Sequence, residues 1–235
     1  MIFWLCPLLA FLAGSIPFGL LIARSRGIDI RAHGSGNIGA TNVLRIVGKK
    51  YGIACLLLDF IKGLVPTLLA ISLIRFTGGD RTLVIPALAA LGTELPADRQ
   101  LFVQSMHVIT GLAAILGHNY SPFAGFRGGK GIATTGGVLI ALMPAAVVIL
   151  LLIWGILLLT TRYVSVASIG AALCLPLLTL FGSWFHGKIA DGTWNRPLLV
   201  FAILAGLMAV WRHRSNIRNL ANGTEHRFTR KSRNA

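Results

Sequence analysis

Long uncharged stretches, separated by short polar segments, dominate the chain. The first of them, residues 2–23, carries no charged side chain. At about 1.5 Å per residue it is long enough to cross a hydrocarbon core of about 30 Å. Similar apolar stretches recur to the C-terminal region. They predict membrane spans near residues 3–23, 52–74, 101–116, 131–142, 145–160, 166–181 and 197–211.

The fold class that follows is an all-α, polytopic integral membrane protein with about seven transmembrane helices. Several predicted spans are shorter than the roughly 20 residues of a full crossing, so we expect some to be half-helices or to break near Gly and Pro. Residues 76–100 are mixed in character and are interpreted as an external loop that in part re-enters the membrane. We expect residues 1–235 to form a single membrane-embedded domain that ends in a basic cytoplasmic tail, 212–235.

The composition agrees with a membrane protein. Hydrophobic residues make up 55% of the chain, charged residues only 12%, and the mean hydropathy is +0.75, which excludes an ordinary soluble domain. The first basic residues, Arg24 and Arg26, follow the first apolar stretch instead of preceding it, so we expect this segment to remain in the mature protein. The three cysteines lie in apolar stretches without metal-ligand spacing, and we expect neither disulfides nor a metal site.

The distribution of lysine and arginine predicts the orientation. With seven spans the two termini lie on opposite faces, and sixteen of the 22 basic residues fall in loops on the C-terminal face. The positive-inside rule then makes the C-terminus cytoplasmic and the N-terminus external. The sixteen are Arg24, Arg26, Arg31, Arg45, Lys49, Lys50, Arg127, Lys130, Arg162, Arg212, Arg214, Arg218, Arg227, Arg230, Lys231 and Arg233.

One pair of charges falls inside a predicted span. Asp59 and Lys62 stand three residues apart, so they share a helix face and can neutralise each other where a lone charge would be costly. We interpret them as a structural pair, with a direct catalytic role as the alternative.

Three basic loops are rich in Gly, Ser, Thr and Asn, residue types that present backbone N–H groups, hydroxyls and amides to an anion. A shorter fourth loop, RYVSVAS (162–168), has a similar character. A basic face by itself is explained by topology and by attraction to anionic lipid head groups; the composition of these loops indicates phosphate binding in addition. The three loops are GSGNIGATNVLR (34–45), GHNYSPFAGFRGGKGIATTGG (117–137) and RHRSNIRNLANGTEHR (212–227).

Two nucleotide-binding motifs are excluded. Gly34, Gly36 and Gly39 have G-x-G-x-x-G spacing, but a membrane span precedes them in place of the strand of a βαβ unit. GFRGGKGI (125–132) has no Ser or Thr after Lys130, so it is not a Walker A motif. The glycines are therefore assigned to a phosphate group in another fold.

The three loops resemble the three cytoplasmic signatures of the bacterial acylphosphate:glycerol-3-phosphate acyltransferases, the PlsY family. The resemblance to this family extends over nearly the whole chain. The stretch 93–106 is longer than the family pattern and falls in the predicted external loop. The resemblance implies transfer of a fatty acyl group from acyl phosphate to the 1-hydroxyl of sn-glycerol 3-phosphate. The products would be lysophosphatidic acid and inorganic phosphate. It implies no cofactor, no nucleic acid and no obligate protein partner.

Carried over residue by residue, the resemblance places Ser35, Lys130, His213 and Asn216 as catalytic residues. Lys130 and the loop N–H groups would stabilise negative charge on the reacting carbonyl and the departing phosphate, and Arg45 would hold glycerol phosphate by a bidentate contact. The implied substrate-binding residues are Gly34, Gly36, Asn37, Thr41, Asn42, Arg45, Gly128, Gly129, Gly131 and Ser165.

The general base is left open between the substrate and a side chain. A leaving phosphate with a second pKa near 6 can accept the proton of the attacking hydroxyl, and His213 is the alternative. Asp29 and Glu225 are the acidic residues on the predicted cytoplasmic face, and we assign neither to a phosphate-binding loop.

Two other interpretations of the sequence are less well supported. His186 and Asp191 form H-x-x-x-x-D, the signature of a different acyltransferase class, but they fall in a predicted external loop, so we interpret them as a chance match.

A membrane transporter of phosphate or an organophosphate anion is the alternative function. No inverted repeat is visible, and the polar loops lie on one predicted face, which disfavours it.

Overall fold

A computed structural model describes residues 2–228 of the chain. The chain divides into two compact units, each described here by itself. The first is Met1–Pro144 with Asn195–Phe201, and the second is Ala145–Trp194 with Ala202–Ala235. The single domain expected from the sequence stays a prediction, and residues 229–235 of the expected basic tail lie outside the described residues.

The first unit is built mainly of helices. They are α1 (Ile2–Ser15), α2 (Phe18–Arg24), η1 (Ile30–Ala32), α3 (Ala40–Ile46), α4 (Lys49–Leu73), α5 (Pro86–Ala89), η2 (Ala97–Arg99), α6 (Gln100–Asn119), η3 (Pro122–Ala124) and α7 (Ile132–Leu142). The second unit contains α8 (Pro144–Thr161), α9 (Val164–Phe185), the greater part of α10 (Arg196–Arg212) and α11 (Arg214–Ala221).

Glycines allow the long helices of the first unit to pack closely. A side chain at Gly14 of α1 would collide with the backbone of Ala114 in α6, and one at Gly117 of α6 would collide with the carbonyl of Phe11. Between α4 and α7, a side chain at Gly137 would collide with the carbonyl of Phe60 in the same way. Small residues at such contacts are typical of membrane helices, where close backbone approach replaces the hydrophobic effect as the driving force.

The first predicted span is a broken helix. Pro17 supplies no backbone N–H and separates α1 from α2. Together α1 and α2 are still long and apolar enough for one crossing, Ile2–Arg24, as predicted for the first apolar stretch.

The seven predicted spans are only partly supported. Among the described residues, five helical segments are long and apolar enough to cross a membrane. They become six if the bent pair α10 and α11, at 53° to each other, counts as one span. The predicted span 131–142 corresponds to α7, whose 11 residues cover roughly 16 Å and are too short to cross alone.

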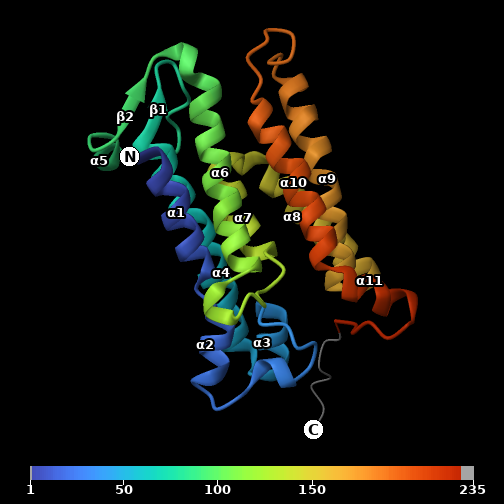
Figure 1. Ribbon diagram of the computed structural model, residues 1–235. Helices are drawn as coiled ribbons and strands as arrows, with labels where there is room; N and C mark the ends of the chain where they lie inside the picture. Colours follow the sequence, from blue (N-terminus) through green and yellow to red (C-terminus); the bar gives the residue numbers. More distant parts are fainter. Residues whose placement is uncertain (1, 229–235) are drawn as a thin grey trace. The chain divides into compact units, whose positions relative to one another are not determined.

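The fold is mainly helical, as expected, but the interpretation of residues 76–100 as a loop is incomplete. Ile74–Phe76 (β1) and Thr93–Leu95 (β2) form a small parallel sheet in which Arg75 pairs with Glu94. It lies at the end of α4 and α6 opposite to α2 and α3 (Figure 1). Strands of three residues are too short to show alternation in the sequence, and the side chains of Arg75 and Arg81 on Glu94, at 3.7 and 2.7 Å, add support that the pattern does not reveal.

Candidate active site

The first basic loop is folded around the side chain of Asn42. This residue is 2% exposed, its Oδ1 accepts a hydrogen bond from the backbone N–H of Ser35 at 3.1 Å, and its Nδ2 donates to the carbonyls of His33 and Asn37 at 3.1 and 2.9 Å. Gly34, with φ of 58°, lies so close to Asn42 that a side chain there would collide with Oδ1. The amide that the sequence predicts as a donor to substrate therefore organises the loop.

The hydroxyl and guanidinium groups predicted in this loop are available on its surface. Ser35, Thr41 and Arg45 are exposed. Thr41 and Arg45 both lie on α3, four residues apart, so they share one helix face. Asn37 is half-buried, and its Oδ1 accepts the N–H of Gly39 at 2.8 Å immediately before this helix. The loop thus presents a charged and a hydroxyl group from a backbone fixed by Asn42.

The second basic loop brings Lys130 to the start of α7. Gly131, with φ of 82°, is the N-cap residue of this helix, whose first N–H groups have no partner within the helix and carry partial positive charge. Gly129 donates its N–H to the carbonyl of His118 at 3.2 Å, and a side chain at Gly128 would collide with the same carbonyl. The loop backbone is therefore pressed against the end of α6, and glycine is required for that approach.

The two loops of the first unit are joined to each other. Arg31, beside the first loop, donates from Nη2 to the carbonyl of Ala124 at 2.6 Å. Ser121, within the second loop, donates its hydroxyl to the carbonyl of Ser15 at the end of α1. Ser35, Arg45 and Lys130 thus come from loops that are tied to one another in the same unit.

In the second unit, Ser165 and Asn216 meet on one carboxylate. Ser165 is 3% exposed, and its hydroxyl donates to Oε1 of Glu225 at 2.7 Å. Asn216, on α11, donates from Nδ2 to the same oxygen at 2.7 Å. Glu225 therefore fixes the beginning of α9 relative to α11 within this unit.

The segment that carries Glu225 is held by two further contacts. Arg227 donates from Nε to the hydroxyl of Tyr163 at 3.0 Å, and Phe228 donates its N–H to the carbonyl of Arg162 at 2.7 Å. The hydrogen bond that Arg227 donates to Tyr163 raises the pKa of the Arg227 guanidinium, which leaves that group charged. Residues 225–228 therefore pack along residues 162–165.

Sequence reasoning missed the role of Glu225. The sequence identifies it only as one of two acidic groups on the predicted cytoplasmic face. Its position inside 212–227, one of the three polar loops, was the available signal. Which residue it binds depends on the folding of α9 and α11, and the sequence pattern does not contain that information.

Replacing Glu225 by Ala is expected to reduce folded yield as well as activity. The buried hydroxyl of Ser165 and the amide of Asn216 would lose their shared acceptor, and an unsatisfied buried polar group costs about 1–3 kcal/mol. The midpoint of thermal unfolding and the size-exclusion profile measure this change. Glu225→Gln keeps one acceptor oxygen and should lie between Glu225→Ala and the wild type; equal stability of all three proteins would contradict the assignment.

His213 is buried at the junction of α10 and α11. It is 2% exposed, and its Nδ1 lies 2.8 Å from the carbonyl of Ala209. A carbonyl only accepts hydrogen bonds, so Nδ1 carries a proton, and in the neutral ring Nε2 then holds the lone pair. This is the tautomer that a base acting through Nε2 requires.

The H-x-x-x-x-D residues lie between α9 and α10, outside these loops. Among the described residues, no hydrogen bond or ion pair joins His186 to Asp191, and both side chains are exposed. The ring of His186 packs edge-on against Phe185, with centroids 5.4 Å apart. The described part of the chain also contains no group of three or more His, Cys, Asp or Glu residues that could hold a metal ion.

Comparison with known proteins gives the family. A family model described as glycerol-3-phosphate acyltransferase matches residues 4–223. The glycerol-3-phosphate acyltransferase of Aquifex aeolicus is 40% identical over 219 residues, covering 93% of this chain and 95% of that protein. The enzyme of the same name from Geobacter sulfurreducens is 42% identical over 220 residues, covering 93% and 94%.

Solved structures agree with this result. The crystal structure of PlsY, an integral membrane glycerol 3-phosphate acyltransferase, in its glycerol 3-phosphate form has a TM-score of 0.77 and 37% identity, covering 97% of this chain and 96% of PlsY. The lysophosphatidic acid form has a TM-score of 0.75 and 36% identity, covering 97% and 95%. Together with the multiple apolar helices, these matches make the chain a multi-pass membrane protein, and it belongs to the glycerol-3-phosphate acyltransferase family.

Proposed function

We propose that this protein transfers a fatty acyl group from acyl phosphate to the 1-hydroxyl of sn-glycerol 3-phosphate. The products are lysophosphatidic acid and inorganic phosphate. The observation that carries the proposal is the first unit's pair of joined loops, in which exposed Arg45 and the Lys130 loop offer separate cationic sites for two phosphate-bearing substrates. The names of the relatives, and the glycerol 3-phosphate and lysophosphatidic acid forms of PlsY, support the acceptor and the product.

The proposed reaction needs no covalent intermediate on the enzyme. Its main requirement is stabilisation of the negative charge that develops during acyl transfer. The 1-hydroxyl oxygen attacks the acyl carbonyl carbon, and the bond from that carbon to the phosphate oxygen breaks. Negative charge grows on the carbonyl oxygen and on the departing phosphate. Lys130, the glycine N–H groups and the start of α7 supply positive potential there, while Arg45 holds the phosphate of glycerol 3-phosphate.

The proton of the attacking hydroxyl goes to the departing phosphate in this proposal. A phosphate with a second pKa near 6 accepts it as the acyl bond breaks. His213 in the Nδ1–H tautomer is the alternative acceptor. Glu225 is assigned a structural role instead, because its Oε1 accepts hydrogen bonds from both Ser165 and Asn216.

The remaining substrate assignments follow the loops. Ser35 is proposed to contact the glycerol phosphate near the reacting carbonyl, with Asn37 and Asn42 keeping its loop in shape. Thr41 and the glycines at 128, 129 and 131 are proposed to hold the phosphate of the acyl donor.

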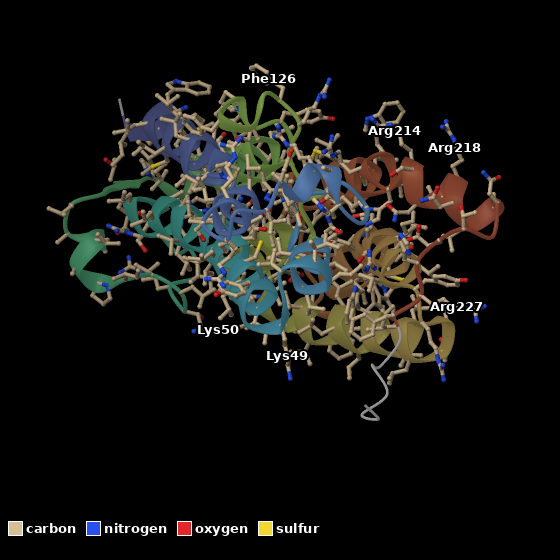
Figure 2. All side chains as sticks on the ribbon, turned by 90° about the horizontal axis from the view of Figure 1, so that it is seen from below. Lys49, Lys50, Phe126, Arg214, Arg218 and Arg227 are labelled. Atoms are coloured by element: carbon tan, nitrogen blue, oxygen red, sulfur yellow. The ribbon has the colours of Figure 1, made fainter. Side chains whose placement is uncertain are left out.

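The proposed topology has seven crossings, an external N-terminus and an active site on the cytoplasmic face of the bacterial inner membrane. Its support is the charge distribution along the sequence. In the first unit Lys49 and Lys50 project outward from the start of α4, and in the second Arg214 and Arg218 project from α11 (Figure 2). Such residues suit the anionic surface of a cytoplasmic leaflet.

The test is phosphate release by detergent-purified protein from palmitoyl phosphate, with and without glycerol 3-phosphate. We expect release that depends on the acceptor, together with equimolar lysophosphatidic acid. Palmitoyl-CoA should not replace the acyl phosphate, and EDTA should leave the rate unchanged because no metal takes part in the proposed steps. Uptake of radiolabelled glycerol 3-phosphate into proteoliposomes without acyl transfer would instead establish the transporter.

A further inference from the structure

Three ionisable side chains are buried together in the first unit, away from the loop surface. Asp59 and Lys62 of α4 and His118 of α6 are 3%, 5% and 6% exposed. Oδ1 of Asp59 lies 2.8 Å from Nζ of Lys62 and 3.6 Å from Nδ1 of His118. We call these three residues the buried ionic cluster.

The need to neutralise the charge of Asp59 does not explain why His118 also lies in the cluster. Lys62, one helical turn away, already pairs with the carboxylate. Buried ion pairs are often no more stable than packed apolar residues of the same volume, and their best attested use is to fix one arrangement among several. The position of His118 identifies what is being fixed.

The imidazole of His118 lies directly beneath the glycine-rich loop. A side chain added at Gly129 would collide with Nε2 of this ring, and the N–H of Gly129 donates to the backbone carbonyl of the same histidine at 3.2 Å. The ring therefore sets how deeply the loop backbone can sit. The carboxylate of Asp59, on the far side of the ring, sets where the ring can lie.

The other end of the cluster reaches the break in the first span. Lys62 donates from Nζ to the carbonyl of Ile16 at 2.8 Å, between α1 and α2. Ser121 donates to the neighbouring carbonyl, that of Ser15. The break in the first span thus receives one contact from the buried ionic cluster, through Lys62, and one from the loop that carries Lys130, through Ser121.

We propose that Asp59, Lys62 and His118 are positioning residues that hold the Gly128–Gly131 backbone at the height needed to bind the phosphate of the acyl donor. The claim that this loop binds the acyl donor rests on the proposed function. The claim that the cluster positions the loop rests only on the contacts described above.

The first test replaces His118 by Phe, which keeps a ring under Gly129 but removes the polar link to Asp59. We expect the KM for palmitoyl phosphate to rise about tenfold or more, since small misplacements of binding groups have effects of this size, with a much smaller change in kcat. Arg75→Gln, which removes a partly buried cation at the opposite end of α4, is the matched control and should leave both constants unchanged.

A second readout needs no substrate. Arg127 is exposed in the loop that carries Lys130. The rate of trypsin cleavage after Arg127 reports how firmly this loop is held. We expect this rate to be about fivefold higher in His118→Phe than in the wild type or Arg75→Gln. If the wild type shows no turnover, the proposed function is contradicted. The cleavage rate still tests whether the buried ionic cluster positions the loop.

The third test uses the collision between Gly129 and the ring. Gly129→Ala alone should raise the KM for palmitoyl phosphate, and His118→Ala in the same chain should recover part of the loss, because the added methyl group then occupies vacated space. A merely structural histidine would make the double variant worse than either single one. That result, or an unchanged KM and cleavage rate in His118→Phe, would overturn the proposal.

Discussion

Replacing Arg45 by Ala is expected to lower kcat/KM for glycerol 3-phosphate by roughly tenfold to hundredfold. The side chain is exposed on α3, on the same face as Thr41, and no hydrogen bond or ion pair within the described residues requires it for folding. A charge-assisted contact to phosphate contributes about 1.5–3 kcal/mol. The loss should appear mainly in KM, with the thermal midpoint unchanged.

Controls separate this effect from a general disturbance. Arg45→Lys keeps the charge but not the bidentate geometry and should recover part of the activity, and Ser35→Ala should also weaken transfer. His186→Ala and Asp191→Ala should be nearly silent, since both lie outside the polar loops. If these two variants lose activity while Arg45→Ala keeps it, the active site has been assigned to the wrong residues.

Much of the fold could be predicted because it depends on local sequence. The apolar stretches predicted the positions of α4, α6, α7, α8, α9 and α10 to within a few residues, and the first stretch covers α1 and α2 together. The interruption of the first span at Pro17 was not predicted, although proline is the residue type that causes it. Spacing along one helix also revealed the Asp59–Lys62 pair, which the structure contains at 2.8 Å.

What could not be predicted depends on contacts between residues far apart in the chain. His118 joins Asp59 from another helix, and Glu225 joins Ser165 across 60 positions. The structural role of Asn42 was missed for a related reason: in the sequence, an amide in a polar loop can equally well bind an anion or organise the backbone. Only the folded loop shows its hydrogen bonds to Ser35 and Asn37.

Lys130 is expected to affect the chemical step, in contrast to Arg45. It stands at the start of α7, next to Gly131, where the helix N-terminus already favours negative charge. In the proposed reaction that charge is largest in the transition state, on the carbonyl oxygen and the departing phosphate. Removing one preorganised group of this kind costs roughly 10²–10³ in kcat. Lys130→Met should therefore lose kcat by this factor.

The comparison with Lys130→Arg decides between two roles for this cation. Arginine keeps the positive charge but not the compact ammonium group, so it should recover part of kcat if charge stabilisation is what Lys130 supplies. Single-turnover measurements with saturating palmitoyl phosphate isolate the chemical step from binding. A Lys130→Met protein with normal single-turnover rate and raised KM would show that Lys130 only binds the donor, and the stabilisation would then fall to the glycine N–H groups and the start of α7.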